Sequence, residues 1–405
     1  MKVRLHSILG IPLLMLILPV LAAAQVTFVQ QSFSAPSGSV PSVQVAFTLM
    51  QTAGNLNIIV VGWTDSTTAP TGVTDTANNT YKLAMGTAQI GSLSQAIYYA
   101  ANINAFASNT VTVTFSGSTN QPDIRILEYK NADQNVPFDV SSWNTGKQVD
   151  AVTSTGNGSG SSAPSTNFAN ELFLGAALPQ GKVGPGGGFK VESGDLTGDI
   201  VEDMNVTTAG IPAVATATST STTGDWVMEM LAIIQSGQGA VPGAAPTITS
   251  VTPGTAKSGV HVDVFIHGTN FRQGINAIFD TTPGVDCSLD PTGTIIDCFA
   301  PPHAAGTAKL VVQNLDGTES APVDFTFSAA AAADFSMSST GAQTVTAGSS
   351  ATYTITITPA NGFSSAVNLT CTPPANVKIT CTLSPSSVTP GSASVTSTLT
   401  VTSTA

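Results

Sequence analysis

Charged residues are scarce in this sequence. Asp, Glu, Lys and Arg make up 9% of the 405 residues, and 24 acidic residues outnumber 12 basic ones, for a formal charge of −12. Binding to nucleic acid requires a basic surface, because the phosphates are negatively charged. Attraction to an anionic membrane surface requires one too. The composition therefore argues against a nucleic-acid partner and against adsorption to an anionic membrane.

Helix signals are nearly missing beyond residue 24. No long stretch places apolar residues at positions i, i+3, i+4 and i+7. Instead, short runs alternate between apolar and polar residues, among them VQVAFTL, NTVTVTF, DIRILEY and ATYTITI. Gly, Pro, Asn or Asp bounds each run, which is typical of short strands joined by tight turns. The sequence therefore predicts an all-β protein built from sandwiches.

Residues 25–236 also lack histidine and cysteine. This excludes Ser-His and Cys-His nucleophiles and His-ligated zinc from that region. No G-x-S-x-G motif is present either. Carboxylates are the remaining catalytic groups, and a glycosidase would need two of them across a cleft.

The first 24 residues have the organisation of a secretory signal peptide. Lys2 and Arg4 form a positive region, residues 8–21 form an apolar run, and three alanines follow at 22–24. The apolar run is short for a membrane span, and polar sequence follows it at once. We expect cleavage before Gln25, export to the cell surface or the medium, and no membrane span after cleavage.

The four cysteines form two close pairs, Cys287 with Cys298 and Cys371 with Cys381. Such pairs can be disulfides, metal ligands or catalytic thiols. In an exported chain, an even number of closely spaced cysteines favours disulfides. A tetrahedral metal site would need four ligands, and each pair offers two. We therefore predict two disulfides.

Composition divides the chain into modules. The predicted arrangement is a signal peptide (1–24), a first module (25–236), a linker (237–244), a middle module (245–328), a linker (329–333) and a third module (334–405). The middle module begins with PTITSVTPGTAKSGVHVDVFIHGTNF and ends with AKLVVQNLDGTESAPVDFTF. It resembles an IPT/TIG domain, which implies an immunoglobulin-like fold. The resemblance rests on Pro246, Ile248, Pro253, Gly259, Val264, Ile266, Gly268, Asn270, Phe271, Val311, Val312, Asn314, Gly317 and Phe325.

The flanking modules carry less specific resemblances. The third resembles immunoglobulin-like repeats of exported bacterial proteins, on the basis of DFSMSS, TYTITITPANGF and CTLSPSSVTPG, and it is expected to be incomplete. The first resembles a jelly-roll-like region of exported proteins of soil bacteria, through VTDTANNTY, IYYAANI, NTVTVTFS and ILEYKNAD. The predicted fold is therefore an N-terminal jelly-roll-like β-sandwich followed by two immunoglobulin-like β-sandwich modules.

Two features of the first module are candidate sites. Asp195, Asp199 and Asp203 lie close together in ESGDLTGDIVED and could supply oxygen ligands to calcium, although the spacing matches no known calcium loop. A solvated acidic loop is the simpler reading. Trp143 lies in the polar stretch DVSSWNTGK, where an exposed indole ring could stack on a sugar. No other cofactor is expected.

The function favoured by the sequence is that of an exported, non-enzymatic binding or adhesion protein. Its first module would hold the ligand, with a glycan or a surface protein as partner, and the other two modules would act as spacers. One alternative is a carbohydrate-active enzyme with a carboxylate pair in the first module. A second alternative is a structural extracellular component.

Overall fold

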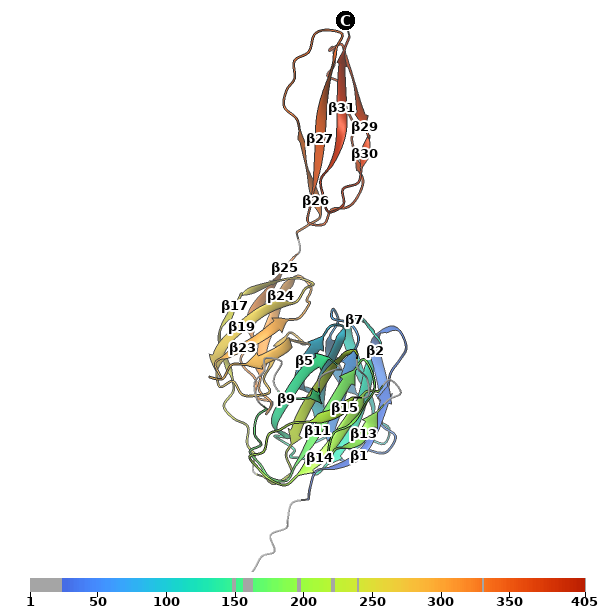
Figure 1. Ribbon diagram of the computed structural model, residues 1–405. Helices are drawn as coiled ribbons and strands as arrows, with labels where there is room; N and C mark the ends of the chain where they lie inside the picture. Colours follow the sequence, from blue (N-terminus) through green and yellow to red (C-terminus); the bar gives the residue numbers. More distant parts are fainter. Residues whose placement is uncertain are drawn as a thin grey trace, which may run out of the picture. The chain divides into compact units, whose positions relative to one another are not determined.

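The computed structural model describes residues 24–147, 151–155, 163–194, 198–219, 223–238, 240–329 and 331–404. The predicted signal peptide lies outside these ranges, apart from its last residue. In the described part, all regular secondary structure is β-strand (Figure 1). Helices that could span a membrane were not found among these residues. The all-β prediction is confirmed.

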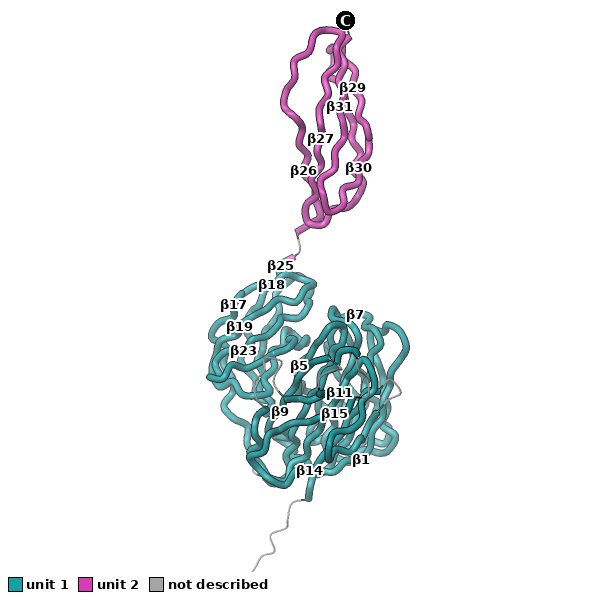
Figure 2. Tube along the Cα trace, viewed as in Figure 1, with its two compact units in different colours: residues 1–328 teal, residues 329–405 magenta. Residues whose placement is uncertain are grey.

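The chain forms two compact units, residues 1–328 and 329–405 (Figure 2). The predicted first and middle modules thus share one unit, and the third module forms the other. The two units are described separately below.

The first eight strands form a jelly roll. They are β1 (Thr27–Ser34), β2 (Ser39–Ala46), β3 (Leu56–Trp63), β4 (Pro70–Asp75), β5 (Lys82–Ile90), β6 (Leu93–Ala100), β7 (Thr110–Asn120) and β8 (Asp123–Lys130). One sheet has the order β1-β8-β3-β6-β5, and the other has the order β2-β7-β4. Strands consecutive in the sequence therefore alternate between the sheets up to β4, as in a jelly roll.

The next eight strands repeat this topology. They are β9 (Phe138–Lys147), β10 (Val152–Thr153), β11 (Glu171–Pro179), β12 (Val183–Pro185), β13 (Lys190–Gly194), β14 (Ile200–Val206), β15 (Thr216–Ser219) and β16 (Asp225–Ile233). The sheet orders are β9-β16-β11-β14-β13 and β10-β15-β12, which match the first roll strand for strand. The predicted jelly-roll-like sandwich is thus confirmed, and it consists of two consecutive rolls of the same design.

The two five-stranded sheets pack against each other. Their shared core contains residues of both rolls, including Ile58 and Leu127 of the first and Leu174 and Leu231 of the second. The central strands β3 and β11 are buried along their whole length. Burial on both faces explains why LNIIVVGW and ELFLGAALP are nearly continuous apolar runs and lack alternation.

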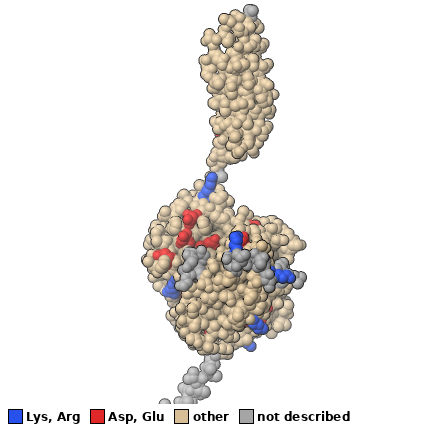
Figure 3. Space-filling model, viewed as in Figure 1, with Lys and Arg blue, Asp and Glu red and all other residues tan. Residues whose placement is uncertain are grey.

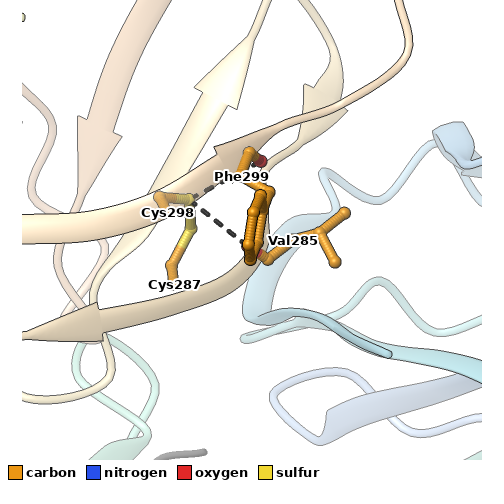
Figure 4. Close-up of a disulfide and its surroundings, with 4 residues drawn as sticks. All are labelled: Val285, Cys287, Cys298 and Phe299. Atoms are coloured by element: carbon orange, nitrogen blue, oxygen red, sulfur yellow. Dashed lines mark hydrogen bonds between the residues drawn. A yellow bond between two sulfur atoms is a disulfide. The ribbon is translucent and has the colours of Figure 1, made fainter. Parts of the chain in front are cut away.

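The middle module is a sandwich of two sheets. Its strands are β17 (Thr247–Thr252), β18 (Thr255–Lys257), β19 (Val262–Thr269), β20 (Asn276–Phe279), β21 (Thr282–Pro283), β22 (Val285–Leu289), β23 (Ile295–Ala300), β24 (Gly306–Gln313) and β25 (Val323–Ser328). One sheet continues the jelly-roll sheet in the order β1-β8-β3-β6-β5-β22-β23-β19-β17, and the other is β18-β25-β24-β20-β21. The Cys287–Cys298 disulfide joins β22 to β23 (Figure 4).

The junction between the first and middle modules is a packed interface. Val285 of β22 pairs with Thr87 of β5, and the Gln89 amide donates a 2.8 Å hydrogen bond to the Asp286 carboxylate. Leu315, from the loop after β24, is 3% exposed and belongs to the core shared by the two rolls. The middle module is therefore built into the sheet and core of its neighbour.

Unit 2 is a small sandwich. Its strands are β26 (Asp334–Ser339), β27 (Ser350–Ala360), β28 (Val367–Asn368), β29 (Ile379–Ser384), β30 (Ser387–Val388) and β31 (Val395–Ser403). They form the sheets β26-β27-β31-β29 and β28-β30. Its main apolar cluster contains four buried residues, Ile355, Ile357, Val367 and Val388, and Ala351 is the fifth buried apolar residue among the described residues of this unit. The Cys371–Cys381 disulfide is present, so both predicted disulfides are confirmed.

Candidate functional site

A pocket of about 560 Å³ lies where loops of the two jelly rolls meet. The first roll contributes the β1–β2 turn, the β7–β8 turn and the start of β6. The second roll contributes the end of β11 and the residue before β14. The lining residues are Ala35, Pro36, Ser37, Thr64, Ser92, Leu93, Asn120, Gln121, Pro122, Asp123, Leu178, Pro179, Gln180 and Asp199. This volume is in the range of small-molecule sites.

The lining combines apolar surface with many hydrogen-bonding groups. Three prolines and two leucines supply the apolar part, and hydroxyl, amide and carboxylate groups supply the polar part. The carboxylate-bearing residues Asp123 and Asp199 are 5% and 4% exposed. A hydroxyl-rich ligand such as a sugar fits such a lining, because it both donates and accepts hydrogen bonds.

Arg125 lies behind the wall of this pocket and contacts the lining residue Asp123. Its side chain is fully buried, and its Nε lies 2.9 Å from the Asp123 carboxylate. Its Nη1 donates to the backbone oxygens of Ala177 and Ile200 in the second roll, at 3.4 and 3.1 Å. One guanidinium therefore fixes Asp123 and fastens the two rolls together.

Two further polar side chains are buried beside Arg125. Gln95 accepts a 3.4 Å hydrogen bond from Arg125 and donates a 3.0 Å bond to the Ala176 carbonyl. Glu229, on β16, is also fully buried. Burial raises the pKa of the Glu229 carboxyl well above its usual value, and Gln95 and Arg125 oppose that rise. A cluster of polar groups thus crosses the interface between the rolls directly behind the pocket.

The structure separates the residues predicted to bind calcium. Asp195 lies outside the described residues. Asp199 lines the pocket, whereas Asp203 lies on β14 and accepts a 3.2 Å hydrogen bond from the Tyr129 hydroxyl. Three residues of extended chain lie between Asp199 and Asp203, so the two residues are about 13 Å apart. Among the described residues, no group of three or more His, Cys, Asp or Glu residues could hold a metal ion, so calcium binding stays a prediction.

Trp143 lies on β9 and is half-buried, in strand and not in a loop. It packs against the core shared by the two rolls and against a smaller cluster around Leu178 and Val227. It lines a cavity of about 30 Å³ at the junction with the middle module, opposite Gly274 and Ile275. That volume suits about one water molecule. Sugar binding by Trp143 stays a prediction.

Sequence reasoning did not identify the pocket. Its walls come from short turns that are far apart in the sequence, and their residues are common turn formers. Pro122 before Asp123, at the start of a strand, and Pro179 before Gln180, at the end of one, were the only local signals. Neither signal indicates that the two turns meet.

Buried carboxyls give the protein a characteristic pH dependence. Burial, with a smaller contribution from Asp139, raises the pKa of Glu171 from 4.5 to about 9. Burial also raises the pKa of Glu202 to about 7. Between pH 4.5 and 9 the folded protein therefore retains protons that the unfolded chain releases, so stability falls as the pH rises through this window.

We expect the urea midpoint of unit 1 to decrease from pH 5 to pH 9, and Glu171→Gln to remove a substantial part of that decrease. Glutamine keeps the shape of the side chain and cannot ionise. Denaturation curves of both proteins at several pH values provide the measurement. Parallel pH profiles for the two proteins would contradict the assignment of Glu171.

Comparison with known proteins identifies one module. Residues 246–327 match the family model of the IPT/TIG domain, so the middle module is an IPT/TIG domain, as its residue pattern predicted. No curated protein matches the chain. The matched residues make up less than half of the sequence.

Two solved structures align over most of the chain at low similarity. One is a protein from Corynebacterium diphtheriae described as membrane anchored, with 8% identity, a TM-score of 0.17 and coverage of 89% of both chains. The other is the BSP domain of a biofilm-associated protein, with 9% identity, a TM-score of 0.16 and coverage of 93% of this chain and 91% of that one. TM-scores this low carry no argument about fold or function.

Proposed function

We propose that this chain is an exported, non-enzymatic binding or adhesion protein, and that its ligand site is the pocket between the two jelly rolls. The observation that carries the proposal is the pocket itself, with a volume of about 560 Å³ and a lining drawn from both rolls. Arg125 and its partners fix the wall before any ligand arrives, so little ordering is needed on binding.

The proposed ligand class is a neutral glycan. Gln121, Gln180 and Asn120 offer both donors and acceptors. The residues Asp123 and Asp199 also border the site, but both carboxylate oxygens of Asp123 are buried beside Arg125. Proline and leucine surface is available to the apolar face of a sugar ring. Two disulfides support an oxidising, extracytoplasmic location.

The enzyme alternative depends on the same two carboxylates. A glycosidase needs one carboxyl group that stays protonated as general acid and one that is ionised. Asp123 forms an ion pair with the buried Arg125, which favours its ionised form. The arrangement favours recognition over catalysis, and hydrolysis of a bound glycan would support the alternative.

The test is a glycan array probed with a fragment of residues 24–328, followed by calorimetry on the best ligand. Ser92 is exposed at the rim of the pocket. We expect Ser92→Trp to fill the pocket and lower the affinity at least tenfold without changing the melting temperature.

Ser42→Trp is the matched control. Ser42 is exposed on β2 and is not part of the pocket lining, so this variant should bind like the parent protein. An equal loss of affinity in both variants, or full affinity in Ser92→Trp, would place the ligand elsewhere. If no glycan on the array binds, the proposal that the ligand is a glycan is wrong.

A further inference from the structure

The IPT/TIG domain presents an unusual outer sheet face. On β19 and β23, alternate residues point into the sandwich, and Val264, Ile266 and Cys298 on that inner face are fully buried. The intervening residues face outward. Strand pairing sets Asp263 opposite Phe299 and Phe265 opposite Asp297. We call Asp263, Phe265, Asp297 and Phe299 the aromatic–acidic face.

All four of these side chains are exposed. Phe265 is 39% exposed and Phe299 is 40% exposed, so two large aromatic rings on neighbouring strands contact water. Single exposed apolar residues are ordinary on a protein surface. The two rings lie diagonally to each other on the sheet, each directly across from an acidic residue, and the disulfide links β23 to its neighbour β22.

The two acidic groups of this face lie close to each other. Diagonal neighbours on one face of an antiparallel pair are about 7–8 Å apart at Cα, within reach of one another's side chains. The pKa of Asp297 is raised by burial, by a hydrogen bond with Asp263 and by the negative charge of Asp263. Like charges this close to each other repel, and this repulsion destabilises the sheet.

The strands around the face supply no lysine or arginine, and the basic side chains on the same side of β19 are the histidines His261 and His267. β17, β19, β22 and β23, which make up the middle-module part of this sheet, contain no lysine or arginine. No described lysine or arginine forms an ion pair with Asp263 or Asp297. Figure 3 shows acidic side chains gathered on the part of unit 1 where Figure 1 places β19 and β23. In a chain with only 9% charged residues, this concentration is a distinctive feature.

We propose that the aromatic–acidic face binds an arginine-containing segment of a partner protein. A guanidinium group bonds carboxylates through two parallel N–H groups and stacks on aromatic rings. The face offers carboxylates and rings side by side, so one arginine can use both at once. A lysine can approach the carboxylates but gains less from the rings.

The partner is a different protein, because this chain offers little that is basic. Residues 329–405 contain no arginine and a single lysine, Lys378. The whole chain carries a formal charge of −12, so two copies repel each other at long range. The site lies on the middle module and shares no residue with the lining of the jelly-roll pocket, so it adds a second function to the one proposed above.

The test is calorimetric titration of the full mature chain with hexa-arginine and hexa-lysine peptides at low ionic strength. We expect hexa-arginine to bind at least threefold more tightly than hexa-lysine. The double variant Asp263→Asn/Asp297→Asn should lose at least tenfold in affinity for hexa-arginine. Its melting temperature should be unchanged or higher, because it relieves the repulsion between the two carboxylates.

Matched controls separate this site from the general negative charge. Glu319→Gln/Asp324→Asn removes two exposed charges from the same domain and should bind within twofold of the parent. Phe265→Leu/Phe299→Leu keeps the apolar surface, removes the rings and should abolish the preference for arginine over lysine.

Three outcomes would overturn the proposal. Equal losses in the two charge variants would show that binding is non-specific attraction. No difference between the peptides, or a preference for arginine that survives loss of both rings, would remove the role of the aromatic face. Binding of a neutral hexasaccharide that depends on the rings and is indifferent to the carboxylates would identify a sugar platform in place of a protein-binding site.

Discussion

Arg125→Met is expected to lower the free energy of unfolding of unit 1 by about 3–5 kcal/mol, because it breaks a buried ion pair and leaves the other charge uncompensated. The side chain has no exposed surface. Its loss would leave Asp123 without its 2.9 Å ion pair and would remove hydrogen bonds to Ala177 and Ile200. Methionine fills much of the volume, so the change reports mainly on the polar contacts.

Arg272→Met provides the comparison. Arg272 also forms an ion pair, with Asp316, but its side chain is 43% exposed. Exposed ion pairs contribute about 0–1 kcal/mol, so this variant should unfold close to the parent. Urea denaturation of residues 24–328 gives both values. If the two variants lost similar stability, the contacts of the Arg125 guanidinium would not be what stabilises the interface between the rolls.

The sequence predicted the elements that depend on local patterns. Alternating runs such as ATYTITI predicted strands, cysteine spacing predicted both disulfides, and the residues from Pro246 to Phe271 predicted the IPT/TIG domain. These features follow from neighbours in the chain or from a short repeating period. They could be predicted from the sequence without knowing which strands pair.

Local patterns in the sequence did not reveal that the jelly roll is duplicated, and they did not reveal the pocket. Asn55 and Asn170 each precede a central strand, and Asp123 and Asp225 each begin the last strand of a roll, but little else is shared. Any apolar residue that fits satisfies a buried strand, so two rolls keep their topology with few identities. Arg125 shows the same limit, because its partners in the second roll are backbone oxygens about 50 to 75 residues away.

Removing the IPT/TIG domain is expected to have the other large effect. A fragment of residues 24–236 should melt about 6–12 °C below a fragment of residues 24–328, if about 3 kcal/mol is lost and each kcal/mol corresponds to about 2–4 °C in a domain of this size. Burial of Leu315 accounts for about 1.5–3 kcal/mol of this. The hydrogen bond from Gln89 to Asp286 adds about 1 kcal/mol.

The shorter fragment should also associate with itself. Without β22, strand β5 loses the pairing of Thr87 with Val285 and its edge is no longer covered, and such open edges pair with other chains. We expect larger species in light scattering for residues 24–236 and monomers for residues 24–328. The sequence predicted that the middle module acts as a spacer, and this comparison tests that prediction directly.

The longer chain, residues 24–405, and its variant Leu315→Ser test whether the loss of stability comes from the contact between the IPT/TIG domain and the jelly rolls. Residues 24–328 and residues 24–405 should share the melting temperature of unit 1, because residues 329–405 form a separate compact unit. In the longer chain, Leu315→Ser should reproduce part of the loss without truncation, because it places a hydroxyl in the core that both rolls share. Equal melting temperatures for residues 24–236 and 24–328, with monomers in both, would show that the IPT/TIG domain is a spacer after all, and that the continuous sheet adds nothing to the stability of the jelly rolls.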